Sequence, residues 1–90
     1  MDAGAEIIVQ GLVQGVGFRY YVYEAARRLK VQGYVRNLPS GDVQVVVEGN
    51  RGMIEDLVRS LRAGPRAAHV NRVHITWTDV VHHFTEFEIR

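Results

Sequence analysis

Five stretches of the chain carry the apolar pattern that is typical of β-strands. In the clearest of them, Val43, Val45 and Val47 alternate with polar Gln44 and Glu48, so that the two faces of a strand differ. The other four stretches are Ile7 to Val13, Gly33 to Leu38, Arg72 to Trp77 and Glu86 to Arg90. The first of these is apolar enough to lie in the centre of a sheet.

Two further stretches have apolar residues at positions i, i+3, i+4 and i+7, which form one stripe on an α-helix. Their members are Val22, Ala25, Ala26 and Leu29 in the first helix, and Ile54, Leu57, Val58 and Leu61 in the second. We expect Gly33 to end the first helix and Gly64-Pro65 to end the second. Residues 38 to 42, Leu-Pro-Ser-Gly-Asp, predict a turn, because Pro presets φ and Gly tolerates positive φ.

The order of these elements is β-α-β-β-α-β with one short additional strand at the C-terminus. Two amphipathic helices have to bury their stripes on one face of the sheet, which predicts a two-layer α+β sandwich with an antiparallel sheet. A split β-α-β topology with right-handed crossovers satisfies this order. The sequence shows no repeat, low-complexity tract or linker, so we expect residues 1 to 90 to form a single domain.

That topology brings distant residues together at one edge of the sheet. The first and second strands run the same way, with the third antiparallel between them, so residues 14 to 19 and Asn37 converge. Two strand spacings span about 9.6 Å, which a ligand and a long arginine side chain can fill. Asn37 shares a strand face with Val35, so it projects toward Arg19 if Val35 faces the helices.

The loop before the first helix has the composition of an anion site. It contains no Ser, Thr, Asp or Asn to cap the helix, and it places Arg19 where the helix dipole is already positive. A bound anion would explain both features, with the glycines directing successive N–H groups inward. No acidic residue occurs between Glu6 and Glu24 to compete. The candidate binding residues are Gln14, Gly15, Val16, Gly17 and Phe18.

Each feature has a simpler alternative. The Gly-x-Gly sequence could form only a tight turn, with Arg19 pointing into solvent. Asn37 could bridge the turn that follows it rather than hold a water or a substrate oxygen. The loop matches neither the phosphate-binding pattern of P-loop proteins nor the dinucleotide-binding fingerprint.

Two segments together, VQGLVQGVGFR at residues 9 to 19 and GYVRN at residues 33 to 37, resemble the signature of the acylphosphatase family. The resemblance extends over nearly the whole chain. It implies a ferredoxin-like fold and hydrolysis of acyl phosphates to a carboxylate and inorganic phosphate, without a metal or another cofactor. It also implies that Arg19 binds the phosphate and that Asn37 orients the attacking water.

The residues themselves fit this chemistry. Phosphoryl transfer requires chiefly positioning and charge stabilisation from the protein. Ser, Thr and Cys are absent near the loop, the first of them being Ser40, so we expect direct in-line attack by water rather than a phospho-enzyme.

Three other functions remain as alternatives. An RNA-recognition domain shares the element order, but the third strand, DVQVVVEG, lacks the aromatic residues that stack on bases. A non-catalytic anion-binding or regulatory module would share Arg19 and the loop without needing Asn37. A domain of a larger carbamoyl-transfer enzyme is the third, although a chain that starts at Met1 argues mildly against it.

Composition narrows the partners. The formal net charge of +1 gives no field that would attract nucleic acid or membranes, and the absence of cysteine excludes disulfides and thiolate metal sites. The four histidines lack metal-ligand spacing, so we expect them at the surface, and Trp77 in the core. No signal peptide or membrane-spanning run is visible, which predicts a cytoplasmic protein, and we expect it to be a monomer.

Overall fold

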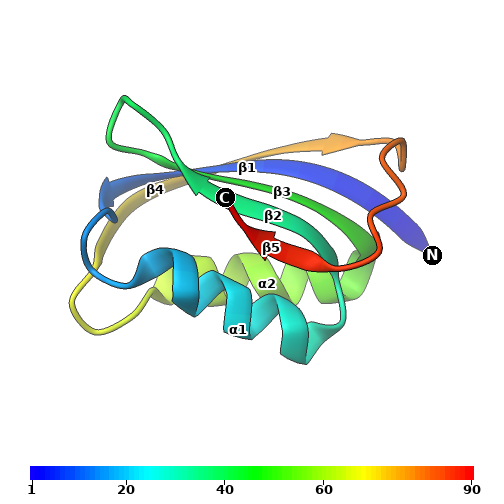
Figure 1. The fold of residues 1–90 in the computed structure, drawn as a ribbon, viewed down its shortest axis with the longest axis horizontal. Coiled ribbons are helices and arrows are strands. Elements are labelled where there is room, and N and C mark those ends of the chain that lie inside the picture. Colours follow the sequence, from blue (N-terminus) through cyan, green and yellow to red (C-terminus); the bar gives the residue numbers. More distant parts are fainter.

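The computed structural model describes all residues from Met1 to Arg90. One sheet forms the upper layer, and both helices pack against its lower face (Figure 1). The elements are β1 (Asp2–Leu12), α1 (Phe18–Leu29), β2 (Gln32–Asn37), β3 (Val43–Asn50), α2 (Arg51–Ala63), β4 (His69–Thr78) and β5 (Phe87–Ile89). This arrangement confirms the predicted two-layer α+β sandwich. Neither helix is long and apolar enough to cross a bilayer.

The strands lie in the order β4-β1-β3-β2-β5. β3 is antiparallel to both β1 and β2, as predicted, and β4 is antiparallel to β1. The expectation of a wholly antiparallel sheet is wrong at one edge, because β5 runs parallel to β2, with Val35 opposite Ile89. The segment between β4 and β5 crosses the sheet before the chain enters it again (Figure 1), which gives β5 this direction.

The core lies between the sheet and the helices. Val43, Val45 and Val47 of β3 are fully buried, which confirms the predicted face of that strand. Both helical stripes contribute to the core as predicted, although Leu29 is only partly buried. The whole buried cluster comprises Ala5, Ile7, Val9, Val13, Phe18, Val22, Ala25, Ala26, Val31, Val35, Val43, Val45, Val47, Ile54, Leu57, Val58, Leu61 and Phe87.

Two predictions about individual residues need correction. The first helix ends before Gly33, at Leu29, and Lys30 takes the left-handed conformation that closes it. Gly33 lies within β2, where a Cβ would overlap the Val46 carbonyl oxygen, so close strand approach explains the glycine. Trp77 contacts the core but is only half-buried, because its strand is at the sheet edge, and the Arg51 guanidinium covers its ring at 4.1 Å.

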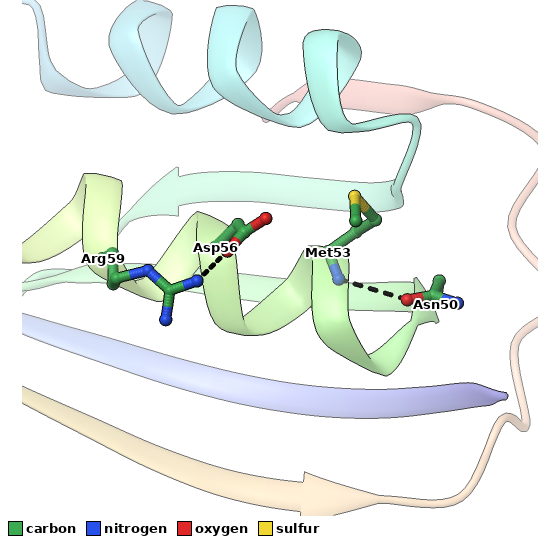
Figure 2. A network of polar contacts seen from close by, with 4 residues as sticks. All are labelled: Asn50, Met53, Asp56 and Arg59. Carbon is green, nitrogen blue, oxygen red and sulfur yellow. Dashed lines mark hydrogen bonds and ion pairs between the residues drawn. The ribbon is translucent and has the colours of Figure 1, made fainter.

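The second helix starts with a side-chain cap. The Asn50 Oδ1 accepts a hydrogen bond of 3.3 Å from the Met53 N–H, and an ion pair between Asp56 and Arg59 follows one turn later (Figure 2). An N-cap of this kind satisfies a backbone donor that has no partner within the helix. At the other end, Gly64 closes the helix as predicted, its N–H donating to the Ser60 carbonyl.

The face of the sheet that the helices leave uncovered holds a buried carboxylate. Glu48 of β3 is 4% exposed and accepts backbone hydrogen bonds from Val81, His82 and Phe84. Burial by itself raises the pKa of Glu48, but the N–H donors favour the charged form and bring its pKa below the ordinary value. Glu48 therefore fixes the segment that leads into β5.

Candidate active site

The sheet topology places the β1–α1 loop, the start of α1 and the end of β2 around one cavity of about 240 Å³. The lining residues are Val13, Gly15, Gly17, Phe18, Arg19, Tyr20, Asn37 and Ile89. This confirms the predicted convergence of the loop with Asn37. The last lining residue comes from β5, which ends at the same side of the molecule as the start of α1 (Figure 1).

The two loop glycines are required for backbone conformation. Gly15 has φ of 73° and Gly17 has φ of 77°, both in the left-handed region. A Cβ at either position would meet no atom within 4 Å, so lack of space is not the reason for glycine. The loop can therefore fold back sharply and deliver the chain into α1 with its amides next to the cavity.

The start of α1 has no cap from the protein. Gly17 occupies the N-cap position without a side-chain hydrogen bond, and the first turn contains no acidic residue. None of the N–H groups of residues 14 to 17 has a backbone acceptor, and the first N–H groups of any helix lack partners within it. A group of backbone donors is thus available beside the cavity.

Arg19 stands in the first turn of α1, at the cavity wall, and is exposed. Its one hydrogen bond within the protein runs from Nη1 to the main-chain oxygen of Arg90, at 3.5 Å. That length is at the weak limit of such bonds, and no Asp or Glu side chain forms an ion pair with Arg19. The guanidinium therefore keeps most of its donors for a ligand.

Asn37 is the last residue of β2, on the strand face that Val35 shares, and Val35 is fully buried. The Asn37 Oδ1 is buried and has no hydrogen-bond partner in the protein. Burying an oxygen in this way costs free energy unless another group donates to it. Asn37 lines the cavity, and its Oδ1 is the only buried side-chain polar atom of the protein that lacks a hydrogen-bond partner.

Three loop side chains that were candidates for binding point elsewhere. The Gln14 Nε2 donates to the carbonyl oxygens of Leu38 and Asp42, at 2.8 Å each. Val16 packs against the core, and Phe18 is buried with 1% exposure. Gln14 and Val16 are not among the residues that line the cavity, whereas Phe18 is, and the Gln14 side chain fixes the loop to the β2–β3 turn beside Asn37.

Residues 5–89 match the family described as Acylphosphatase. The acylphosphatase of Anaeromyxobacter dehalogenans is 49% identical over 86 residues, which are 96% of this chain and 92% of that relative. The crystal structure of acylphosphatase from Bacillus subtilis has a TM-score of 0.95 and 32% identity, covering 98% of each chain. The chain belongs to the acylphosphatase family.

The acylphosphatase fold also occurs inside a much longer protein. Full-length HypF, solved in a phosphate- and nucleotide-bound form, has a TM-score of 0.92 and 28% identity to this chain. The match covers 100% of this chain and 12% of that one.

Within this acylphosphatase fold, the remaining sequence candidates have structural positions. The four histidines are exposed, as predicted, and no group of three His, Cys, Asp or Glu side chains is arranged to hold a metal ion. Among the tyrosines that follow the loop, which the sequence did not single out, Tyr20 lines the cavity. Tyr21 instead donates to the Ser60 carbonyl, and Tyr23 packs on the core.

Sequence reasoning missed one residue that lines this cavity, Ile89, and the contacts of the Gln14 side chain. Ile89 was assigned only to a terminal strand, and Gln14 was taken as a ligand-binding residue rather than as a tie to the β2–β3 turn. A signal existed for Gln14, because a long polar side chain next to a buried valine has to find partners nearby. Nothing in the sequence indicated that β5 would pair beside β2.

Proposed function

We propose that this chain hydrolyses acyl phosphates to a carboxylate and inorganic phosphate, with Arg19 and the 14–19 loop binding the phosphate and Asn37 holding the attacking water. Membership of the acylphosphatase family supports the reaction. The observation that supports the assignment of roles is the lining of the cavity, which combines an uncapped helix start, a guanidinium without an Asp or Glu partner and a residue, Asn37, whose amide oxygen is unpartnered.

The phosphate half of the site combines two kinds of donor. Backbone N–H groups at a helix start bind anions through hydrogen bonds and the helix dipole. The planar fork of a guanidinium matches two phosphate oxygens, and each charge-assisted hydrogen bond contributes about 1.5–3 kcal/mol. Arg19 in the first turn costs only about 0.3–1 kcal/mol against the dipole, so a bound phosphate offsets this cost.

The water half of the site is Asn37. Its Oδ1 accepts a hydrogen bond from a water and so directs a lone pair of that water toward phosphorus. This arrangement gives the unpartnered oxygen its donor and places the nucleophile beside the bound phosphate. A carboxamide has no basic group at neutral pH, so Asn37 acts as a positioning residue for the water and does not take its proton.

The reaction balances without any further reagent. The water oxygen forms a bond to phosphorus, and the bond between phosphorus and the acyl oxygen breaks, its electron pair leaving with the carboxylate. The proton of the water passes to a phosphoryl oxygen of the dianionic substrate, and the products are a carboxylate and dihydrogen phosphate. A carboxylate is a good leaving group, so no general acid is assigned.

Hydrolysis of benzoyl phosphate in the presence of a metal chelator tests this proposal. Arg19→Gln and Asn37→Ala should each lower kcat/KM by about 10²–10³-fold, because each removes a group that stabilises or positions the transition state. Asn37→Ala should leave the melting temperature unchanged or higher, since it removes a buried oxygen that has no partner.

Matched controls are available elsewhere in the chain. Arg28→Gln removes another exposed cation of α1, and Asn71→Ala removes an exposed carboxamide of β4. Both should retain wild-type turnover. A wild type that binds phosphate through Arg19 but hydrolyses nothing would identify an anion-binding module instead and overturn the enzymatic proposal.

A further inference from the structure

Two large apolar side chains at the cavity are left exposed by the fold. Tyr20 is 62% exposed and Ile89 is 43% exposed, and both line the site. The other exposed large apolar residues, Met1, Leu12, Met53 and Val81, do not line it. Neither Tyr20 nor Ile89 belongs to the buried core or packs against it, so core packing does not account for either residue.

One side of the Tyr20 ring packs against another aromatic ring. It stacks on Tyr23 at 6.2 Å between centroids with 27° between the ring planes, and Tyr23 in turn contacts Phe87 at 6.5 Å. The Glu24 carboxylate, one turn further along α1, raises the pKa of the Tyr20 hydroxyl. An aromatic ring fixed in this way presents its free surface with little loss of side-chain entropy on binding.

β5 supplies the opposite part of the same apolar surface. Phe87 and Ile89 are two residues apart on β5, so their side chains share a strand face. Because Phe87 contacts the Tyr23 ring that supports Tyr20, this face of β5 is directed toward α1. Ile89 is therefore on the α1 side of β5 at the cavity, and Tyr20 directly follows Arg19 in the chain.

We infer that Tyr20 and Ile89 form an acyl subsite. This subsite favours acyl phosphates with an aromatic acyl group over those with a small acyl group such as acetyl. This inference rests on the proposed function. The donors of the loop and Arg19 hold the phosphate, and the acyl ring stacks on Tyr20 and contacts Ile89. A cavity of about 240 Å³ suits one ring and a phosphate rather than a larger conjugate.

Selectivity between benzoyl phosphate and acetyl phosphate tests the subsite. Tyr20→Ala should lower kcat/KM for benzoyl phosphate by about 3- to 10-fold and change that for acetyl phosphate by less than about 2-fold, as the loss of one aromatic pair predicts. Tyr20→Phe should restore the benzoyl preference, because it keeps the ring and loses only the hydroxyl. Ile89→Ala should reduce the benzoyl preference by a smaller factor. Val81→Ala, at a 65% exposed residue outside the cavity, should not change that preference.

Binding of non-hydrolysable analogues separates this inference from the proposed function. Calorimetry with benzoylphosphonate and acetylphosphonate should show tighter binding of the aromatic compound to the wild type and loss of that difference in Tyr20→Ala, whether or not turnover occurs. The affinity for inorganic phosphate should be unchanged in Tyr20→Ala. Equal losses for both acyl groups, or failure of Tyr20→Phe to restore selectivity, would overturn the subsite, whereas a wild type inert toward both substrates would count against the hydrolase alone.

Discussion

The two helices lie side by side under one sheet, but their N-termini are built differently. α2 follows Asn50, an extended residue whose side chain accepts the Met53 N–H. α1 follows Gly17, a left-handed residue without a side chain, and carries Arg19 in its first turn. The sequence of α2 thus favours stability, whereas that of α1 gives up a cap worth about 1 kcal/mol. The difference is that the chain leaves the backbone donors at the start of α1 without a side-chain partner.

Glu48 extends the comparison beyond helices. The N–H groups of Val81, His82 and Phe84 converge on its carboxylate, in a part of the molecule remote from the cavity. Here an anion of the chain itself satisfies a cluster of backbone donors. At the 14–17 loop no acidic side chain of the chain does so, which supports an external anion there.

The largest effect is expected when α1 receives an acidic N-cap residue, which removes the difference between the two helix starts. Gly17→Asp should lower kcat/KM for benzoyl phosphate by at least about 10²-fold, because a carboxylate at the cavity would take the free N–H groups and repel the dianion. The melting temperature should change little, since the cap gain of about 1 kcal/mol offsets a left-handed penalty of about 1–2 kcal/mol. Enzyme assays and thermal unfolding by circular dichroism measure the two effects.

A neutral residue at the same position provides the control. Gly17→Asn tolerates the left-handed conformation and adds no charge, so its loss of activity should be clearly smaller. Equal losses in both variants would mean that backbone strain, and not the carboxylate, accounts for the effect.

Removing the charge of Glu48 should have the next largest effect, on stability. Glu48→Gln should lower the free energy of unfolding at pH 7 by about 1.5–3 kcal/mol, because it loses the charge-assisted bonds to three backbone N–H groups. The folded-state pKa of Glu48 lies below the ordinary value of about 4.3, so its contribution is present above that pH. It is lost as the pH falls through the folded-state pKa.

Urea unfolding of both proteins across a pH series measures this difference. The gap between the wild type and Glu48→Gln should narrow below about pH 4, as the wild-type carboxyl becomes protonated. A gap that stays constant down to pH 2 would contradict the assigned role of the charge.

The smallest effect is expected at the cap of α2. Asn50→Ala should destabilise the fold by about 1 kcal/mol, which lowers the melting temperature by about 4–8 °C in a domain of this size. Turnover at a temperature where the variant is folded should equal that of the wild type, because Asn50 lies outside the cavity. A loss of activity in the folded variant would show that the two helix starts are coupled.

Local patterns were sufficient to predict most of the fold. Apolar spacing identified both helices and all five strands, and the split β-α-β order placed Arg19 and Asn37 at one edge. The start of β1 at Asp2 was missed, because its first residues, Asp, Ala and Gly, have little strand preference.

What the sequence did not reveal depends on contacts between distant residues. The Glu48 carboxylate bonds the backbone more than thirty residues away, and Ile89 reaches the cavity only because β5 pairs beside β2. Gly33 was predicted to end the first helix. The sequence alone does not distinguish a glycine that ends a helix from one that lets a neighbouring strand approach closely. Hydrophobic periodicity indicates which face of an element is apolar, but it does not indicate which distant residues come into contact.

The Gln14 amide contacts one carbonyl on each side of the β2–β3 turn. Surface turns are usually where related proteins gain or lose residues, since a bulge there disturbs little else. In this turn, one inserted residue would move the carbonyl of Leu38 or Asp42 away from the Gln14 amide. The loop would then lose a hydrogen bond that connects it to the end of the strand with Asn37. The length of this hairpin turn therefore helps to fix the position of the loop relative to Asn37.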